Sequence, residues 1–95
     1  MSVARVRSLS FKTKEKADQF EKVFAKVGSV YLPTAISNIN IRSDDFTCLC
    51  VTVYPDEQAA ERGLDGVAEF NEHFPEILDA AEDNFYLEGN VTNFT

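Results

Sequence analysis

The sequence predicts a single α+β domain with the element order βαββαβ, in which two helices cover one face of a four-stranded antiparallel sheet. The chain has 95 residues, which allows one hydrophobic core but not a second. Two segments place apolar residues at helical spacing, and four others are rich in alternating or β-branched residues. Taken along the chain, these six segments follow the order βαββαβ.

The first strand is expected at 3–11, VARVRSLSF, because it is rich in β-branched and alternating residues. A helix should follow, capped by Thr13 and ended by Gly28. Its apolar stripe consists of Ala17, Phe20, Val23, Phe24 and Val27. Charged residues occupy the opposite side, so one face of this helix should pack against the sheet.

The segments ISNINI and FTCLCVTVY should form a hairpin around the polar turn RSDD. The loop length decides which residues share a face of the sheet. With two or four loop residues, Ile39 and Ile41 join Phe46, Cys48 and Cys50; with three, they join Thr47, Leu49 and Val51. The sequence leaves this register open. Both faces of FTCLCVTVY are apolar, which indicates a strand covered on both sides.

Cys48 and Cys50 lie two residues apart on one expected strand, so their side chains point the same way. A separation of roughly 6.6 Å along the strand is poor geometry for a disulfide. A metal would need further soft or imidazole ligands, and the chain holds one histidine. We therefore expect buried, reduced cysteines and no metal site.

The second helix should begin after Pro55 with Asp56 as its cap. Pro75 either ends this helix or opens a short further one, PEILDAA. The last strand is expected at 84–94, NFYLEGNVTNF. On a helical wheel, the residues within about 60° of Val67 form the packed face: Ala60, Gly63, Leu64, Phe70, Asn71 and Phe74.

The same wheel places Asn71 on the packed face of the second helix and His73 outside that face. An inward Asn71 must hydrogen-bond either to neighbouring backbone or to a ligand. His73, the only histidine, suits proton transfer near neutral pH, but it lies about 120° from Val67 and next to a proline. We expect His73 to be a partly solvated surface residue, and the sequence assigns no catalytic residue.

Sixteen acidic and nine basic residues give a formal charge of -7, which repels phosphate backbones and anionic membranes. No segment is long and apolar enough to cross a bilayer, and the N-terminus lacks the apolar core of a signal peptide. A soluble cytoplasmic protein is expected, with neither nucleic acid nor membrane as a partner. Arg5 and Arg7 share one strand face and could hold an anionic ligand or acids of a partner subunit.

Two segments, VTVYPDEQAAERG (51–63) and YLEGNV (86–91), resemble the dimeric α+β-barrel family, the antibiotic-biosynthesis-monooxygenase-like domains. The first looks like that family's third strand running into Tyr-Pro and the second helix. The second is similar to its closing strand, in which Gly89 permits a bend or a bulge. The resemblance spans residues 1–95 as a single such domain. It implies a ferredoxin-like fold and a homodimer whose two sheets pack face to face as a barrel.

The family includes cofactor-independent monooxygenases, haem-degrading enzymes and lactone isomerases. Its monooxygenases hold phenolic substrates with pocket Asn, Arg, Tyr and Trp residues, and side chains of the first three kinds are present here: Asn38, Arg42, Tyr31, Tyr54 and Asn71. Of the Asn, Trp and His that haem-degrading members use, only His73 has a match. The resemblance implies a monooxygenase without a cofactor that acts on a small aromatic or phenolic substrate. A non-catalytic dimer that binds a small ligand or another protein is the alternative.

Overall fold

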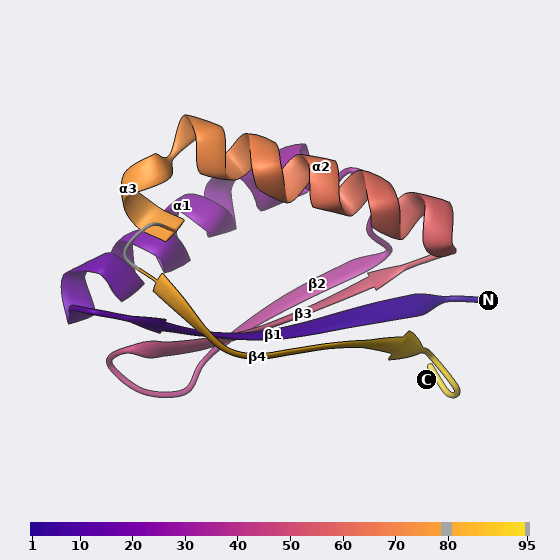
Figure 1. The fold of residues 1–95 in the computed structure, drawn as a ribbon, viewed down its shortest axis with the longest axis horizontal. Helices are drawn as coiled ribbons and strands as arrows, with labels where there is room; N and C mark the ends of the chain where they lie inside the picture. The colour runs from indigo at the N-terminus through magenta and orange to yellow at the C-terminus, as the bar shows by residue number, and fades with distance from the viewer. Residues whose placement is uncertain (79–80, 95) are drawn as a thin grey trace.

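The computed structural model describes residues 1–78 and 81–94 of the chain. Its elements are β1 (Val3–Phe11), α1 (Lys14–Tyr31), β2 (Ser37–Arg42), β3 (Thr47–Tyr54), α2 (Glu57–His73), α3 (Pro75–Leu78) and β4 (Ala81–Asn90). The predicted order βαββαβ is confirmed, with α3 as the short helix that Pro75 opens. The helices form one layer above the sheet (Figure 1). No helix among the described residues is long and apolar enough to span a membrane.

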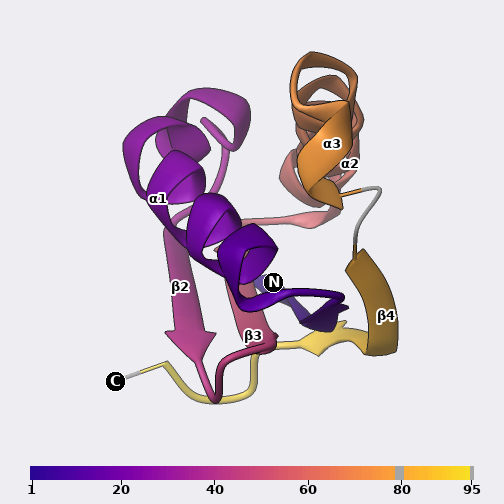
Figure 2. The same ribbon diagram turned by 90° about the vertical axis from the view of Figure 1, so that its left-hand side faces the viewer.

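The sheet is antiparallel throughout, and its strand order is β2-β3-β1-β4. β1 lies inside the sheet between β3 and β4, whereas β2 and β4 are the edges. All three helices lie on the same side of the sheet (Figure 2). The fold therefore has one face covered by helices, called the inner face below, and one face without helices, called the open face.

Two predicted boundaries are wrong. α1 continues past Gly28 to Tyr31, because Gly28 keeps helical backbone and its carbonyl accepts a hydrogen bond from Leu32 N at 2.9 Å. Gly28 is buried beneath the Phe24 ring, which would lie 2.7 Å from an added Cβ, so the glycine serves packing rather than termination. β4 begins at Ala81 rather than at residue 84 and ends at Asn90.

The hairpin between β2 and β3 takes the three-residue register. Ser43 N donates to Thr47 O at 3.0 Å, which leaves residues 44–46 as the loop. The Asp44 carboxylate closes this turn by accepting bonds from the backbone N–H groups of Phe46 and Thr47, each at 2.8 Å. These backbone bonds, the one from Phe46 above all, hold the pKa of Asp44 below its usual range. Ile39 and Ile41 consequently share the open face with Leu49 and Val51.

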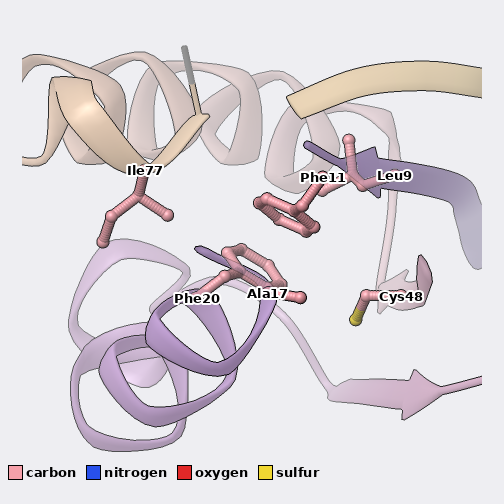
Figure 3. Close-up of a cluster of buried hydrophobic side chains, with 6 residues drawn as sticks. All are labelled: Leu9, Phe11, Ala17, Phe20, Cys48 and Ile77. Atoms are coloured by element: carbon pink, nitrogen blue, oxygen red, sulfur yellow. The ribbon is translucent and has the colours of Figure 1, made fainter. Parts of the chain in front are cut away.

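The main core lies between the strands β1 and β3 and the helices α1 and α3. Its buried members are Leu9, Phe11, Ala17, Phe20, Cys48 and Ile77. Figure 3 shows Ile77 reaching from α3 toward the Phe20 ring on α1. Phe20 in turn packs on Phe11 with ring centroids 5.4 Å apart. Cys48 and Cys50 are both free, as the sequence predicted, but of the two only Cys48 is buried, and Cys50 is half-buried.

The predicted packed face of α2 is wrong by roughly 50° on the helical wheel. The buried residues of this helix are Ala59, Ala60, Gly63, Gly66 and Phe70, whereas Leu64 and Asn71 are exposed. Gly66 decides the rotation, because a Cβ there would lie 1.8 Å from the carbonyl oxygen of Tyr31. The helix therefore turns its glycines toward its neighbours and Asn71 toward solvent.

The open face carries two rows of side chains that cross all four strands. One row is Ile39, Val51, Val6 and Leu87, and the next is Ile41, Leu49, Ser8 and Phe85. The four residues on the edge strands are each about half exposed: Ile39 53%, Ile41 47%, Phe85 46% and Leu87 53%. An apolar surface of this extent is typical of a contact site.

Candidate functional site

A cavity of about 350 Å³ lies between the helices and the inner face of the sheet, a volume suited to a small molecule. Its roof is apolar and comes from α1 and α2, with Phe24, Leu64, Val67 and Phe70 as the main side chains. Its floor is polar and comes from β1, β3 and β4, with Arg5, Arg7, Thr52, Tyr54, Asp83 and Tyr86. The cavity can therefore hold an aromatic body above and polar groups below.

Arg5 is held by its own chain. Its Nε donates to Glu88 Oε2 at 3.1 Å, and its Nη1 donates to the carbonyl oxygen of Ala60 on α2. The guanidinium also lies over the Tyr54 ring, 5.7 Å from the centroid. With 11% of its side chain exposed, Arg5 ties α2 to the sheet.

Arg7 lies two residues further along β1, and its side chain is more exposed than that of Arg5. Its Nε donates to Asp83 Oδ1 at 2.9 Å, and the two side chains are 31% and 52% exposed. Both arginines thus pair with carboxylates of β4 in the same chain. The sequence left open whether the two arginines hold an anionic ligand or the acids of a partner subunit. In the structure they instead form ion pairs within their own chain.

Two phenols face the cavity from the strands. Tyr54 is buried, and this burial raises the pKa of its phenol, with the nearby Arg5 charge acting in the opposite direction. Gly63 makes room for this ring, since a Cβ there would lie 2.1 Å from the phenol oxygen. Partial burial also raises the pKa of Tyr86, whose hydroxyl donates to Glu88 Oε2 at 3.2 Å. Both phenols are therefore neutral at neutral pH, and Tyr54 can donate its O–H to a ligand, whereas Tyr86 donates to Glu88.

The far end of the cavity is bounded by Tyr31 at the end of α1. Its ring meets the edge of Phe70 at 5.4 Å, and its hydroxyl lies 2.5 Å from His73 Nδ1 at the end of α2. His73 is exposed and does not line the cavity. It joins the ends of the two roof helices through Tyr31.

Cys50 also lines the cavity. A hydrogen bond with Cys48, together with burial, raises the pKa of the Cys50 thiol. The thiol is therefore protonated at neutral pH and is a poor nucleophile. Among residues 1–78 and 81–94, no three His, Cys, Asp or Glu side chains come together as a metal site would require.

No family model matches this sequence, and no curated protein matches it. Solved structures do match. SnoaB from Streptomyces nogalater, described as a cofactor-independent oxygenase, is 16% identical, with a TM-score of 0.74 over 98% of this chain and 95% of its own. HapK from Hahella chejuensis is 17% identical, with a TM-score of 0.76 over 100% and 96%.

A dimeric ferredoxin-like protein from an uncultured marine organism is 12% identical, with a TM-score of 0.78 over 99% of this chain and 98% of its own. This chain has the fold of the dimeric α+β-barrel proteins. The resemblance predicted from 51–63 and 86–91 is confirmed at that level. At these identities the match shows the fold, and the activities belong to the proteins named.

Within this ferredoxin-like fold, three of the six candidate ligand residues line the cavity: Tyr31, Tyr54 and Asn38. Asn38 donates to Thr52 Oγ1 at 2.6 Å. His73 lies outside the lining and contacts Tyr31, and Asn71 lies on the solvent side of α2.

Arg42 also lies outside this cavity. The three-residue hairpin register places it at the turn, where Nε and Nη2 donate to the carbonyl oxygens of Asp44 and Asp45, each at 2.7 Å. Its Nη1 lies 3.0 Å from Asp18 Oδ1 on α1. The hydrogen bond from Lys14, followed by the one from Arg42, lowers the pKa of the Asp18 carboxyl. Arg42 thus fastens the hairpin to α1.

Sequence reasoning missed the lining residues Asp83, Tyr86 and Thr52. Tyr86 lies within the YLEGNV segment that was assigned to the last strand, so alternation along that strand could have found it. Asp83 gave no such signal, because it precedes the predicted start of the strand at residue 84.

Proposed function

We propose that the protein is a homodimeric, cofactor-independent monooxygenase that acts on a small aromatic or phenolic substrate. The cavity carries this proposal, because it places an aromatic and aliphatic roof over a floor of neutral phenols and paired charges. A planar ring can pack between Phe24, Phe70 and the strands, while hydroxyl or carbonyl groups bond to the floor. The shared fold with a protein described as a cofactor-independent oxygenase supports the choice of reaction.

The reaction needs a substrate that is itself the reductant. A phenolic ring system with an acidic CH₂ group meets this need: two C–H bonds break, one oxygen atom forms a C=O bond, and the other leaves as water. The four electrons that reduce O₂ come from the substrate. The protein's part is to orient the ring and to stabilise negative charge that develops on the ring oxygen. Tyr54 is the neutral donor placed for that role, because Tyr86 already donates its single O–H to Glu88.

Homodimer formation is supported by the open face. Its two apolar rows lie on the side of the sheet that no described helix covers, and packing two such faces together would bury well over ~1,000 Å², the range of stable interfaces. One structural relative is described as dimeric. In the dimer both faces of β3 would be covered, as its composition predicts.

Oxygen uptake by the purified protein tests the reaction. Anthrones and related phenols would be supplied without added metal or flavin, and the product quinone would be measured with the oxygen consumed. We expect one O₂ consumed per C=O group formed. A Tyr54→Phe variant should lower kcat about tenfold or more with a smaller effect on KM, since it removes a donor that acts as charge develops. A protein that binds these compounds and consumes no oxygen would contradict the enzyme assignment.

A non-catalytic dimer that binds a small ligand is the second candidate. It is favoured by one observation: Asp83, the carboxylate on the floor, is paired with Arg7 and is therefore not an unpaired base. Tight binding of phenols without turnover would support this candidate. A dimer that binds no such compound would leave recognition of another protein as its role.

A further inference from the structure

The two ion pairs beneath the cavity differ in how far a ligand can reach them. Arg5 and Glu88 form the more enclosed pair, and Glu88 does not belong to the cavity lining. Arg7 and Asp83 both line the cavity, with side chains 31% and 52% exposed. A ligand in the cavity can therefore contact both members of the Arg7–Asp83 pair.

Bonding capacity remains on that pair. Among the residues that the structure describes, Arg7 makes one side-chain hydrogen bond, from Nε to Asp83 Oδ1. Its two terminal nitrogens and Asp83 Oδ2 have no partner within this part of the chain. Arg5, in contrast, already uses Nε and Nη1. The Arg7–Asp83 pair thus offers donors and an acceptor side by side.

A β-bulge places Asp83 in this position. The register of β4 on β1 shifts between Ser8 and Leu9, leaving Asn84 as the extra residue. The Asn84 amide donates to Ser10 Oγ at 2.7 Å and to Ser8 Oγ at 3.2 Å, which holds the bulge. In a strand paired regularly through Asn84, without the bulge, alternation would turn Asp83 to the open face. Bulges beside binding sites commonly redirect a side chain in this way.

We propose that the Arg7–Asp83 pair recognises a neutral phenol hydroxyl and that Asp83 sets this specificity. The hydroxyl oxygen accepts from a terminal nitrogen of Arg7, and its O–H donates to Asp83 Oδ2. A carboxylate can accept from Arg7 but brings a second negative charge beside Asp83, and this repulsion should lower its affinity about tenfold or more. The inference rests on the proposed aromatic-binding function and names the ligand's protonation state and the residue that selects it.

Three naphthalenes of one size test the proposal. 2-Naphthol is a neutral donor and acceptor, 2-methoxynaphthalene only accepts, and 2-naphthoate is an anion. The chain has no tryptophan, so naphthalene fluorescence can be followed at neutral pH with little background. The wild-type dimer should bind 2-naphthol about tenfold more tightly than either of the other two compounds.

Asp83→Asn removes the charge and keeps the shape. This variant should raise the affinity for 2-naphthoate about tenfold and so remove the preference for 2-naphthol. Glu88→Gln is the matched control, because it removes the same charge at a carboxylate that lies outside the lining, and it should leave the preference within about twofold. Circular dichroism confirms that both variants fold. Arg7→Met is the second test and should weaken binding of 2-naphthol and 2-naphthoate alike.

Equal affinity of the wild type for 2-naphthol and 2-naphthoate would overturn the role of Asp83 while leaving an aromatic pocket in place. So would an unchanged preference in Asp83→Asn, or the same change in Glu88→Gln. If none of the three compounds bound, both this inference and the aromatic-binding function would fail. Failure of the oxidation alone would appear separately, as binding with the expected selectivity but no oxygen uptake.

Discussion

On the inner face, the middle of the sheet carries Arg5, Arg7 and Thr52, whereas on the open face the same strands present Val6 and Val51. In a monomer, the face under the helices holds the charges and the face toward solvent holds the apolar rows. This distribution is the reverse of what burial alone would produce. It places a cavity with a polar floor on the inner face and supports the proposal that a second subunit covers the open face.

The two faces also differ in what a substitution should disturb. Changes on the open face should alter association and leave the cavity intact. Changes on the inner face and its helices should alter the cavity or the stability of each subunit. The following variants test this division, beginning with the largest expected effect.

Ile39→Asp introduces a charge into the first apolar row, at a side chain that is 53% exposed in the single chain. Burying an unpaired carboxylate in an apolar contact costs several kcal/mol, so the dimer should weaken by about a thousandfold or more. Sedimentation equilibrium measures the change.

Val30→Asp is the matched control for association. Val30 is 70% exposed on α1, away from the open face, and this variant should associate as the wild type does. A wild-type protein that is monomeric at micromolar concentration would contradict the proposal that a second subunit covers the open face. Equal weakening by both variants would show that the contact is not confined to the open face.

Gly66→Ala tests how closely α2 approaches α1. The new Cβ would lie 1.8 Å from the carbonyl oxygen of Tyr31, so the helices must separate, at a cost of about 3 kcal/mol in the free energy of unfolding. Asp65→Ala is the control, because Asp65 is exposed on the same helix and lies away from the open face. It should change stability by less than about 0.5 kcal/mol. Denaturant melts at one dimer concentration provide the comparison, and equal losses would contradict the described packing of α2.

His73→Ala and Asn71→Ala give the smallest expected effect and test the corrected rotation of α2. His73→Ala removes the bond to the Tyr31 hydroxyl and should cost about 1 kcal/mol of stability. Asn71→Ala changes an exposed side chain and should cost less than about 0.5 kcal/mol. The wheel centred on Val67 predicts the opposite order, so the same denaturant melts decide between the two rotations.

The sequence predicted the candidate site only in part. Tyr54 and Asn38 were identified by residue type and do line the cavity, because alternation along their strands turns them to the inner face. Arg42 has the same facing but lies at the hairpin turn, where Asp18 and the loop carbonyls engage it. Residue type alone could not separate these cases, since the difference lies in distance along the sheet.

By itself, the sequence determined the order of the elements, the caps at Thr13 and Asp56 and the apolar character of both faces of β3. These features depend on residues close together in the chain, where spacing and side-chain chemistry suffice. The tertiary structure alone decided the rotation of α2 and the bulge at Asn84. Gly66 meets Tyr31, and Asn84 meets Ser8 and Ser10, only after distant segments have come together. Such contacts leave no periodic signal in the sequence, and they place Asp83 in the cavity and Asn71 outside it.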